Sequence, residues 1–318
     1  MRSNPPDMPQ PANKPAASRD PNLRALTPLD YGLYATSVLV WGVSWIAMHY
    51  QVGTVAPEVS VVWRFAIAAP LMFMAAIARG ESLRFPLADH RYLIGLGAGI
   101  FSTNFILFYH AAQYVASGLL SIVFSLASVG NVILGALVFG ARIERRAIMG
   151  GTLGVAGVAA MFYPELGGLS FDGTAMLGLL LALGGTMSFC LANMISVAAQ
   201  RRRLPIFAST AWGMTYGTGF VTLVALARGQ TFTFDWSVTY LGGLAYLSIL
   251  GSFVAFGVYF TLLGRIGAAR TGYTTVMYPV VALVVSTFAE DYRWSLLAAC
   301  GLAAVLLGNV LILRTPKK

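Results

Sequence analysis

The side chains best suited to hold a small organic molecule lie on apolar stretches of the chain. Trp41, Ser44, Trp45 and Met48 recur at i, i+3, i+4 and i+7, which places them on one face of a helix. Tryptophan rings bind apolar groups, and hydroxyls donate and accept hydrogen bonds. This face therefore predicts either an aromatic wall of a binding site or a helix-packing surface, and the spacing fits both.

More polar and aromatic side chains recur within other apolar stretches. Asn104 lies well inside the stretch at 92–113, where an amide without a hydrogen-bond partner is costly. The stripe of Ser121, Ser125 and Ser128 suits either close helix packing or the polar wall of a cavity. The candidate substrate-binding residues are Trp41, Trp45, Asn104, His110, Ser121, Ser125, Asn193, Tyr246, Ser252, Tyr259 and Tyr278.

Arg64 is the one charged side chain inside an apolar stretch. A charge at the centre of a bilayer costs about 2.5–3.5 kcal/mol on insertion scales, so its presence needs a reason. One interpretation is structural, with the stem packed on apolar surface and the head reaching the interface or another helix. The other is functional, with the guanidinium paired to a substrate carboxylate. The residue itself leaves both interpretations open.

Pro279 directly follows Tyr278 inside another apolar stretch. A proline inside a helix removes one backbone hydrogen bond, frees a carbonyl and bends the helix. We therefore predict a hinge or gate at Pro279.

The acidic residues restrict the chemistry. All twelve fall at the ends of apolar stretches or in the connections between them. We therefore expect no carboxylate at the membrane midplane to exchange a proton for a cation, and any proton movement would have to involve His49 or His110. Cys190 and Cys300 lie inside apolar stretches and are expected to be packing residues. We predict neither a metal ion nor another cofactor.

An intramembrane enzyme is the rival class. A protease would need paired aspartates or a serine activated by a histidine at membrane depth. The aspartates are missing at that depth, and no serine has a recognisable nucleophile context. His110 beside a serine of 116–140 is the only conceivable dyad, so we do not expect an enzyme.

These residues require helices that cross a membrane. The 318-residue chain is 57% hydrophobic and 10% charged, whereas soluble domains carry about 25% charge. About 20 apolar residues cross a bilayer as a helix. The fold class is therefore an all-α integral membrane protein with ten transmembrane helices, near 31–51, 59–78, 92–113, 117–139, 147–163, 175–198, 206–227, 238–262, 270–288 and 294–313.

The basic residues orient these helices. Eighteen of the 21 Lys and Arg residues fall on the side of both termini, and only Arg228 and Arg293 fall opposite. Positive charge marks the cytoplasmic side, so both termini are expected in the cytoplasm of a multi-pass protein of the cell (inner) membrane. The charge reflects orientation rather than a nucleic-acid partner.

Residues 1–28 are rich in proline and polar side chains, which predicts a disordered cytoplasmic tail. They lack the apolar core of a signal peptide, so we expect the first helix to direct membrane insertion.

The second half of the chain echoes the first. At an offset of 151 residues Gly150 aligns with Gly301 and Gly157 with Gly308. Five helices end opposite to where they begin, so a second copy is inverted, as is typical of secondary transporters. We assign one repeat to 29–164 and the other to 172–314. Glycine pairs such as Gly213 and Gly217 predict tight contacts, either within the monomer or across a homodimer.

Five segments carry a recognisable pattern: LVWGVSW (39–45), WRFAIAAP (63–70), ASGLLSIVFSLASVGNVILGALVFG (116–140), GGTLGVAGVAAMF (150–162) and TTVMYPVVALVVSTFAED (274–291). Together they resemble the EamA repeats of the drug/metabolite transporter superfamily. The resemblance covers about residues 30–314. It departs at Ser128, whose repeat partner is Pro279, and near Ala141, where the usual acidic residue is missing.

The resemblance implies a function. It implies a secondary transporter in the lipid bilayer that moves a small-molecule substrate by alternating access. Ten-helix bacterial members of the YddG type export aromatic and other hydrophobic amino acids, and an aromatic, hydroxyl-rich site without acid suits such a substrate. The alternative is export of other metabolites or drugs, such as purines or lipophilic cations. The second helix is peripheral in such folds, which favours the structural role for Arg64.

Overall fold

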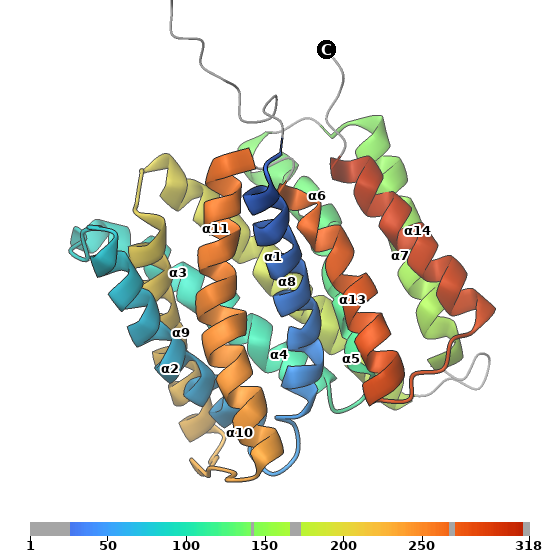
Figure 1. The fold of residues 1–318 in the computed structure, drawn as a ribbon, viewed down its shortest axis with the longest axis horizontal. Coiled ribbons are helices and arrows are strands. Elements are labelled where there is room, and N and C mark those ends of the chain that lie inside the picture. The colour runs from blue at the N-terminus through green and yellow to red at the C-terminus, as the bar shows by residue number, and fades with distance from the viewer. Residues whose placement is uncertain (1–25, 141–142, 166–172, 267–270, 314–318) are drawn as a thin grey trace, which may run out of the picture.

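The computed structural model describes residues 26–140, 143–165, 173–266 and 271–313. Within them, ten helical rods cross the molecule (Figure 1). The first five are α1 (Pro28–His49), α2 (Pro57–Ala78), α3–η2–α4 (Leu87–Ala98, Gly99–Thr103, Asn104–Ala111), α5–α6 (Ser117–Ser125, Ala127–Phe139) and α7 (Arg145–Glu165). The second five are α8 (Gly173–Arg201), α9 (Ile206–Ala227), α10–η4–α11 (Val238–Ala245, Tyr246–Val254, Ala255–Ile266), α13 (Thr274–Ala289) and α14 (Leu296–Leu313).

The lengths of these rods confirm the predicted membrane protein. Eight of the rods are long and apolar enough to cross a membrane. Helix α13 is a shorter apolar helix of 16 residues, and α9 has 22 residues. The observed bounds differ from the predicted ones by a few residues at the ends. Residues 1–25 of the predicted tail lie outside the described residues, as does residue 270, the first of the predicted helix 270–288.

Local sequence signals set where several helices begin and end. At the start of α1 the Thr27 hydroxyl accepts a hydrogen bond from the Asp30 amide at 3.3 Å, while the Asp30 carboxylate accepts one from the Thr27 amide at 2.9 Å. This reciprocal pair satisfies amides that a helix start leaves without partners. Pro57 begins α2, where its missing N–H costs nothing. Gly140 ends α6 with φ of 67°, a conformation that favours glycine.

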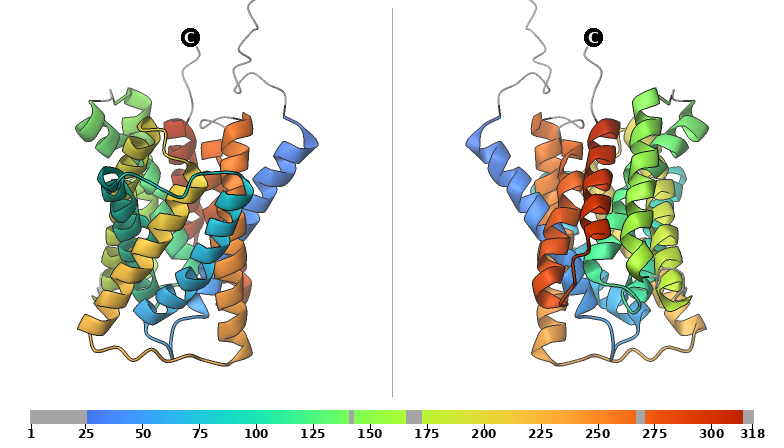
Figure 2. Two further views of the ribbon diagram at one scale, coloured as in Figure 1. Left: turned by 90° about the vertical axis from the view of Figure 1, so that its left-hand side faces the viewer. Right: turned by 90° about the vertical axis from the view of Figure 1, so that its right-hand side faces the viewer.

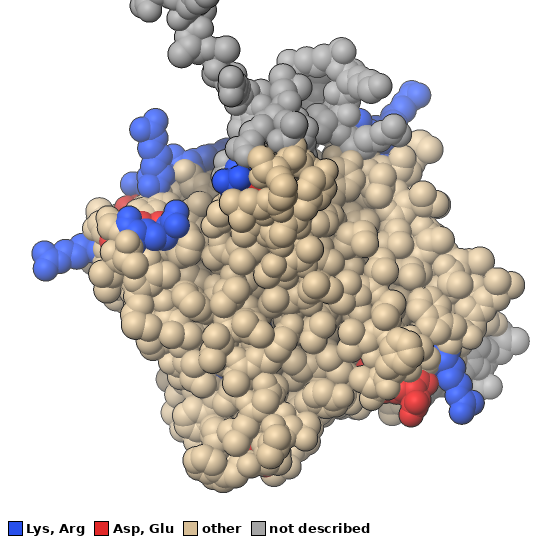
Figure 3. All heavy atoms as spheres, viewed as in Figure 1, with Lys and Arg blue, Asp and Glu red and all other residues tan. Residues whose placement is uncertain are grey.

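Apart from the buried Arg64, the charged side chains of the described residues lie towards the two ends of the bundle (Figure 3). In Figure 3 the visible lysine, arginine and acidic side chains lie at the upper and lower margins, with an uncharged band between them. Helix α1 begins and α14 ends at the same margin (Figure 2). This distribution is the one that a hydrocarbon layer around the middle of the protein requires.

The two halves of the chain have matching irregularities. The third and eighth rods each contain a π-helical segment, η2 and η4, and these end at Thr103 and Val254, which are 151 residues apart. Helices α7 and α14 begin at Arg145 and Leu296, again 151 apart. The sequence offset of the repeat is therefore present in the backbone.

Helices of the two halves pack against each other as an inverted pair requires. Helix α7 lies along α14 on one side of the molecule, and α2 lies along α9 on the other, so equivalent helices of the two halves form pairs (Figure 1). Helix α1 packs on α13 and α11, while its counterpart α8 packs on α6 and α4. The first helix of each half thus packs against the third and fourth rods of the other half, around a shared interior.

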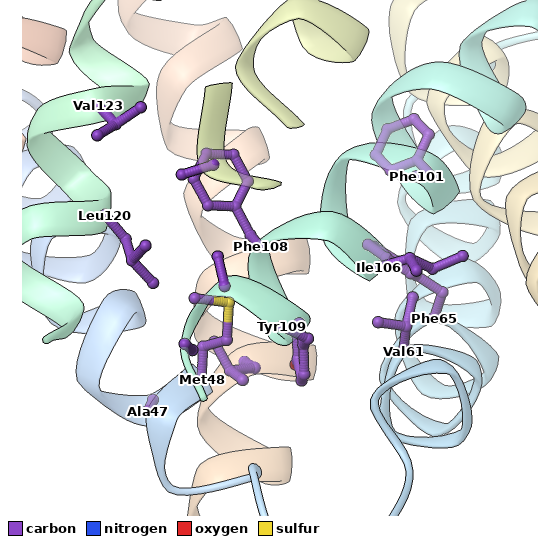
Figure 4. Packing of buried hydrophobic residues seen from close by; sticks show 14 of the residues in the cluster. Ala47, Met48, Val61, Phe65, Phe101, Ile106, Phe108, Tyr109, Leu120 and Val123 are labelled. Atoms are coloured by element: carbon purple, nitrogen blue, oxygen red, sulfur yellow. The ribbon is translucent and has the colours of Figure 1, made fainter. Parts of the chain in front are cut away.

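That interior is apolar and aromatic. Met48 of α1, Phe65 of α2, Phe108 of α4 and Leu120 of α5 belong to one buried cluster (Figure 4). The predicted glycine contacts also occur here within the monomer: a Cβ on Gly217 would lie 2.7 Å from the Cβ of Phe101. The small residues therefore let α9 approach η2 closely.

Candidate functional site

Trp41 lies at the junction of three helices. Its ring centre is 5.3–5.4 Å from those of Phe256 and Tyr259 on α11 and Tyr278 on α13. Helix α1 is therefore bound to the second half of the protein by an aromatic cluster. Edge-to-face packing of this kind orients each ring and leaves the cluster able to hold an apolar group.

Two hydrogen bonds position Trp41 against η4. The indole Nε1 donates to the carbonyl of Gly251 at 3.0 Å, and the Tyr246 hydroxyl donates to the carbonyl of Val40 at 2.9 Å. The wide turn of a π-helix displaces backbone carbonyls from the regular ladder, and such segments occur often at functional sites. Here one of these carbonyls meets the indole.

Tyr278 is buried beside the predicted hinge. Its hydroxyl donates to Thr274 Oγ1 at 2.9 Å and lies 3.4 Å from Ser37 Oγ on α1. Pro279 follows within α13 and is buried. A Cβ on Gly42 of α1 would lie 2.5 Å from the Cβ of Val281, so α1 and α13 are in close contact directly beside this proline. Bending of α13 at Pro279 would shift Tyr278 with respect to Trp41.

Arg64 is buried on the other side of η4. Its Nε donates to the Ser252 hydroxyl at 3.0 Å, and its guanidinium carbon lies 4.3 Å from the ring centre of Phe105. Among the described residues, none of the ion pairs within 4.0 Å involves Arg64. The charge is held by a hydroxyl and an aromatic face rather than by a carboxylate.

One residue joins the two groups. A Cβ on Gly251 would lie 2.9 Å from Ser44 Oγ and 3.8 Å from an Nη atom of Arg64, while the Gly251 carbonyl accepts from Trp41. The aromatic cluster and the buried cation therefore meet at Gly251. A side chain at this position would occupy the space between Ser44 and Arg64.

Trp45, one turn along α1, lies in a second aromatic group. Its ring centre is 5.1 Å from that of Phe108 and 5.6 Å from that of Phe124, both in the first half. Trp41 and Trp45 thus share a helix face in sequence but contact opposite halves of the protein. The arrangement makes α1 the element that any relative movement of the halves must disturb.

Other predicted site residues do not contact the Trp41 cluster and have partners of their own. The Asn104 amide donates to the carbonyl of Gly185 at 2.9 Å, and the Asn193 amide donates to Asn131 at 3.3 Å. Ser121 and Ser125 donate to carbonyls three residues back in their own helix, each at 2.6 Å. The two amide bonds join neighbouring helices, and the two serine bonds lie within α5.

His110 lies at the end of the bundle opposite to the start of α1, the end predicted to face outward (Figure 1). Its Nε2 is 3.0 Å from Glu58 Oε1, which Arg228 Nη1 also approaches at 3.0 Å. The buried Glu58 therefore links the ends of α2, α4 and α9. His110 does not contact the Trp41 cluster.

A second outer carboxylate, Glu290, was not among the predicted site residues. It accepts from the Ser117 amide at 3.1 Å, from the Ser117 hydroxyl at 2.6 Å and from the Ser286 hydroxyl at 2.5 Å. His49 Nδ1 lies 3.3 Å away. Glu290 thus ties the ends of α1, α5 and α13 together. The sequence hints at this contact only by placing His49, His110, Glu58 and Glu290 at the same end of the predicted helices.

The opposite end has its own ties between the halves. Arg265 Nε donates to Asp30 at 2.5 Å, and Arg202 Nε lies 2.8 Å from Asp89. Glu81 accepts from the amide of Ala208 at 2.8 Å, close to the start of α9. Charged contacts therefore join helices at both ends of the bundle, around an aromatic interior that contains the buried Arg64.

Comparisons with known proteins agree with this architecture. The chain is 26% identical over 294 residues to the "Probable amino-acid metabolite efflux pump" of Escherichia coli (strain K12), covering 88% of this chain and 94% of that one. It is 25% identical to the "Uncharacterized transporter YvbV" of Bacillus subtilis (strain 168), covering 84% and 86%. A solved structure titled "Crystal structure of protein" has the same fold, with a TM-score of 0.65 and 21% identity over 89% of this chain and 95% of that chain.

The family comparison covers both halves separately. Residues 31–163 and again residues 176–314 match the EamA-like transporter family. Each of these two ranges covers nearly all of five of the ten rods. The chain is a multi-pass membrane transporter rather than an enzyme, and it belongs to the EamA-like transporter family.

Proposed function

We propose that the chain exports amino acids with aromatic or other hydrophobic side chains, or closely similar metabolites, by alternating access. The observation that carries this proposal is the contact of Trp41 with Phe256, Tyr259 and Tyr278 beside Arg64. The aromatic cluster suits an apolar side chain, and the neighbouring polar groups suit the charged end of an amino acid. The printed name of the Escherichia coli relative is consistent with this substrate class.

The proposed movement exchanges the two sets of end contacts. Glu290 and Glu58 hold helix ends on one side, and Arg265–Asp30 and Arg202–Asp89 hold them on the other. Opening either side breaks one set while the aromatic interior stays between them. We place the end that carries α1's start and α14's end in the cytoplasm, because the described Lys and Arg side chains concentrate there.

Export of lipophilic cations is the weaker alternative. A cation in the bilayer interior needs a carboxylate partner or a proton-exchanging group. Within the described residues the Trp41 cluster makes no contact with an acidic side chain, and the buried charge beside it is itself positive. An amino acid or other carboxylate-bearing solute is electrostatically better matched.

Solute counterflow in proteoliposomes tests the proposal. Vesicles loaded with unlabelled solute are diluted into trace labelled solute, and transient accumulation is measured for phenylalanine, leucine, choline, adenine and glucose. We expect accumulation for phenylalanine and leucine, and none above empty vesicles for choline or glucose. Accumulation of choline or adenine but neither amino acid would contradict the proposed substrate class.

A further inference from the structure

The group of polar side chains around Arg64 has more hydrogen-bond donors than acceptors. The Tyr109 hydroxyl donates to Gln51 Oε1 at 2.7 Å and interacts with the Arg64 guanidinium. Gln51 Nε2 is buried and has no hydrogen-bond partner among the described residues. A guanidinium carries five N–H donors, and the Nε–H is the one bonded to Ser252.

A second donor in the group has no partner. Ser248 lies four residues before Ser252 on η4, about one π-helical turn away, so both face the same side of that segment. Its hydroxyl is fully buried and makes no hydrogen bond within the described residues. Helix η4 packs on both α2, which carries Arg64, and α1, which ends next to Gln51.

Both donors are linked to Arg64, Gln51 through Tyr109 and Ser248 through its place on η4 beside Ser252, and Arg64 has no counterion among the described residues. Arg64 is 4% exposed, and no described carboxylate lies within 4.0 Å of it. In the view of Figure 4, Tyr109 lies between Met48 of α1 and Val61 of α2. All three belong to the buried cluster that includes Phe65 and Phe108. A buried cation surrounded by unpaired donors is stabilised by an anion, and a carboxylate accepts from a guanidinium and a hydroxyl together.

We propose that Arg64, Ser252, Ser248 and Gln51 form a carboxylate subsite, so that the transported solutes are hydrophobic monocarboxylates. The proposal deepens the proposed function and rests on it. Gly251 places this subsite next to Trp41, so the carboxylate lies at Arg64 and the apolar body lies among the rings. Because the described part of the site offers no carboxylate to an ammonium group, the carboxylate is required and the ammonium group is not.

Three solutes with the same phenyl body separate these requirements. Counterflow is measured for phenylalanine, for 3-phenylpropionate, which lacks the ammonium group, and for phenethylamine, which lacks the carboxylate. We expect phenylalanine and 3-phenylpropionate to accumulate and phenethylamine to accumulate at least tenfold more slowly. Equal transport of all three solutes would overturn the carboxylate subsite while leaving a transporter of aromatic solutes.

A different set of transport results would reject the proposed function. Transport of 3-phenylpropionate without phenylalanine would retain the carboxylate subsite and reject amino-acid export. Transport of none of the three would reject both. A chloride ion meets the same donors equally well, so the assay is repeated with chloride replaced by sulfate, an anion without a carboxylate group. Phenylpropionate uptake that needs chloride and does not exceed phenethylamine uptake would assign the donors to an inorganic anion and overturn the subsite.

Variants of the chain give a second, independent result. Ser248→Ala removes an unpaired buried hydroxyl, and Ser209→Ala removes another such hydroxyl from α9 as the matched control. We expect Ser248→Ala to raise the KM for 3-phenylpropionate about threefold to tenfold, with Ser209→Ala unchanged. Arg64→Gln should abolish carboxylate transport, and Arg64→Lys should retain part of it.

Folding is checked for each variant by size-exclusion chromatography in detergent. If Arg64→Gln does not fold, the solute comparison and the serine pair decide. Equal KM values for Ser248→Ala and Ser209→Ala, or undiminished carboxylate transport by folded Arg64→Gln, would overturn the proposal.

Discussion

Gly150 of α7 and Gly308 of α14 meet backbone to backbone: a Cβ on Gly150 would lie 2.5 Å from the Gly308 carbonyl oxygen. Gly157 and Gly301 meet in the same way, again at 2.5 Å. Gly150 and Gly157 correspond to Gly301 and Gly308 at the repeat offset of 151 residues. Each residue therefore contacts the counterpart of the other, which is the pattern that a twofold axis imposes on an interface.

This contact predicts that Gly308→Ala destabilises the protein. The added methyl group would lie 2.9 Å from the backbone nitrogen of Gly154, and neither backbone can move aside easily. Overpacking of this kind costs about 1–3 kcal/mol. The thermal unfolding midpoint in detergent should fall relative to the wild type. Gly135→Ala on α6, where a Cβ meets nothing within 4 Å, is the control and should not lower the midpoint.

Asn104 is predicted to act through stability rather than through the substrate. Its amide donates to the Gly185 carbonyl and so joins α4 to α8. Interhelical hydrogen bonds in membranes contribute about 0.6 kcal/mol on average and up to about 1.7 kcal/mol. Asn104→Ala should lower the unfolding midpoint modestly and leave the KM for phenylalanine unchanged. A raised KM at normal stability would instead make Asn104 a substrate ligand.

Glu290 is predicted to hold the outer end of the bundle closed. Glu290→Gln keeps the shape but removes the charge that meets Ser117 and His49. Hydrogen bonds to charged groups contribute about 1.5–3 kcal/mol, and each 1.4 kcal/mol shifts an equilibrium about tenfold. The protein should therefore spend more time open on this side.

The measurement for Glu290 uses a reporter cysteine. In a background with Cys190→Ala and Cys300→Ala, Ser121→Cys lies one turn beyond Ser117 and is almost fully buried. Labelling by a membrane-impermeant maleimide should be at least several-fold faster with Glu290→Gln. The neighbouring Asp291→Asn is the control and should label at the parental rate. Equal rates for the two variants would rule out Glu290 as the outer tie.

Pro279 is predicted to set the transport rate. Pro279→Ala restores a backbone N–H and straightens α13 next to Tyr278. We expect a lower maximal rate of phenylalanine counterflow with an unchanged KM, because the hinge and not the site is altered. Pro70→Ala, at the outward-facing proline inside α2, should transport normally. A normal rate for Pro279→Ala would exclude the hinge.

The fold was readable from the sequence because each membrane helix must satisfy its own backbone within one apolar stretch. The repeat was readable because glycines at fixed offsets mark close contacts, as Gly150 and Gly301 do. The π-helical segments were not predictable, since no residue of 246–254 departs from an ordinary helix composition. The bounds of η2 and η4 are a property of the folded structure, in which the two halves match.

Only part of the candidate site could be predicted from the sequence. The sequence predicts Trp41, Tyr259 and Tyr278 by residue type, and in the structure Trp41 contacts both tyrosines. The roles of Gly251 and Glu290 were not predicted, because each depends on which helices become neighbours and on which atoms remain free. A glycine that makes room for Arg64 resembles any other helix-contact glycine in sequence.

If the aromatic cluster around Trp41 binds the transported amino acid, replacement of Trp41 should impair phenylalanine transport. Trp41→Ala and Trp236→Ala are reconstituted in parallel, because Trp236 is 78% exposed and lies outside this cluster. Phenylalanine counterflow is then measured at several concentrations. We expect the ratio of maximal rate to KM to fall at least tenfold for Trp41→Ala and to stay unchanged for Trp236→Ala. Phenylalanine transport by folded Trp41→Ala at the wild-type rate and KM would contradict it.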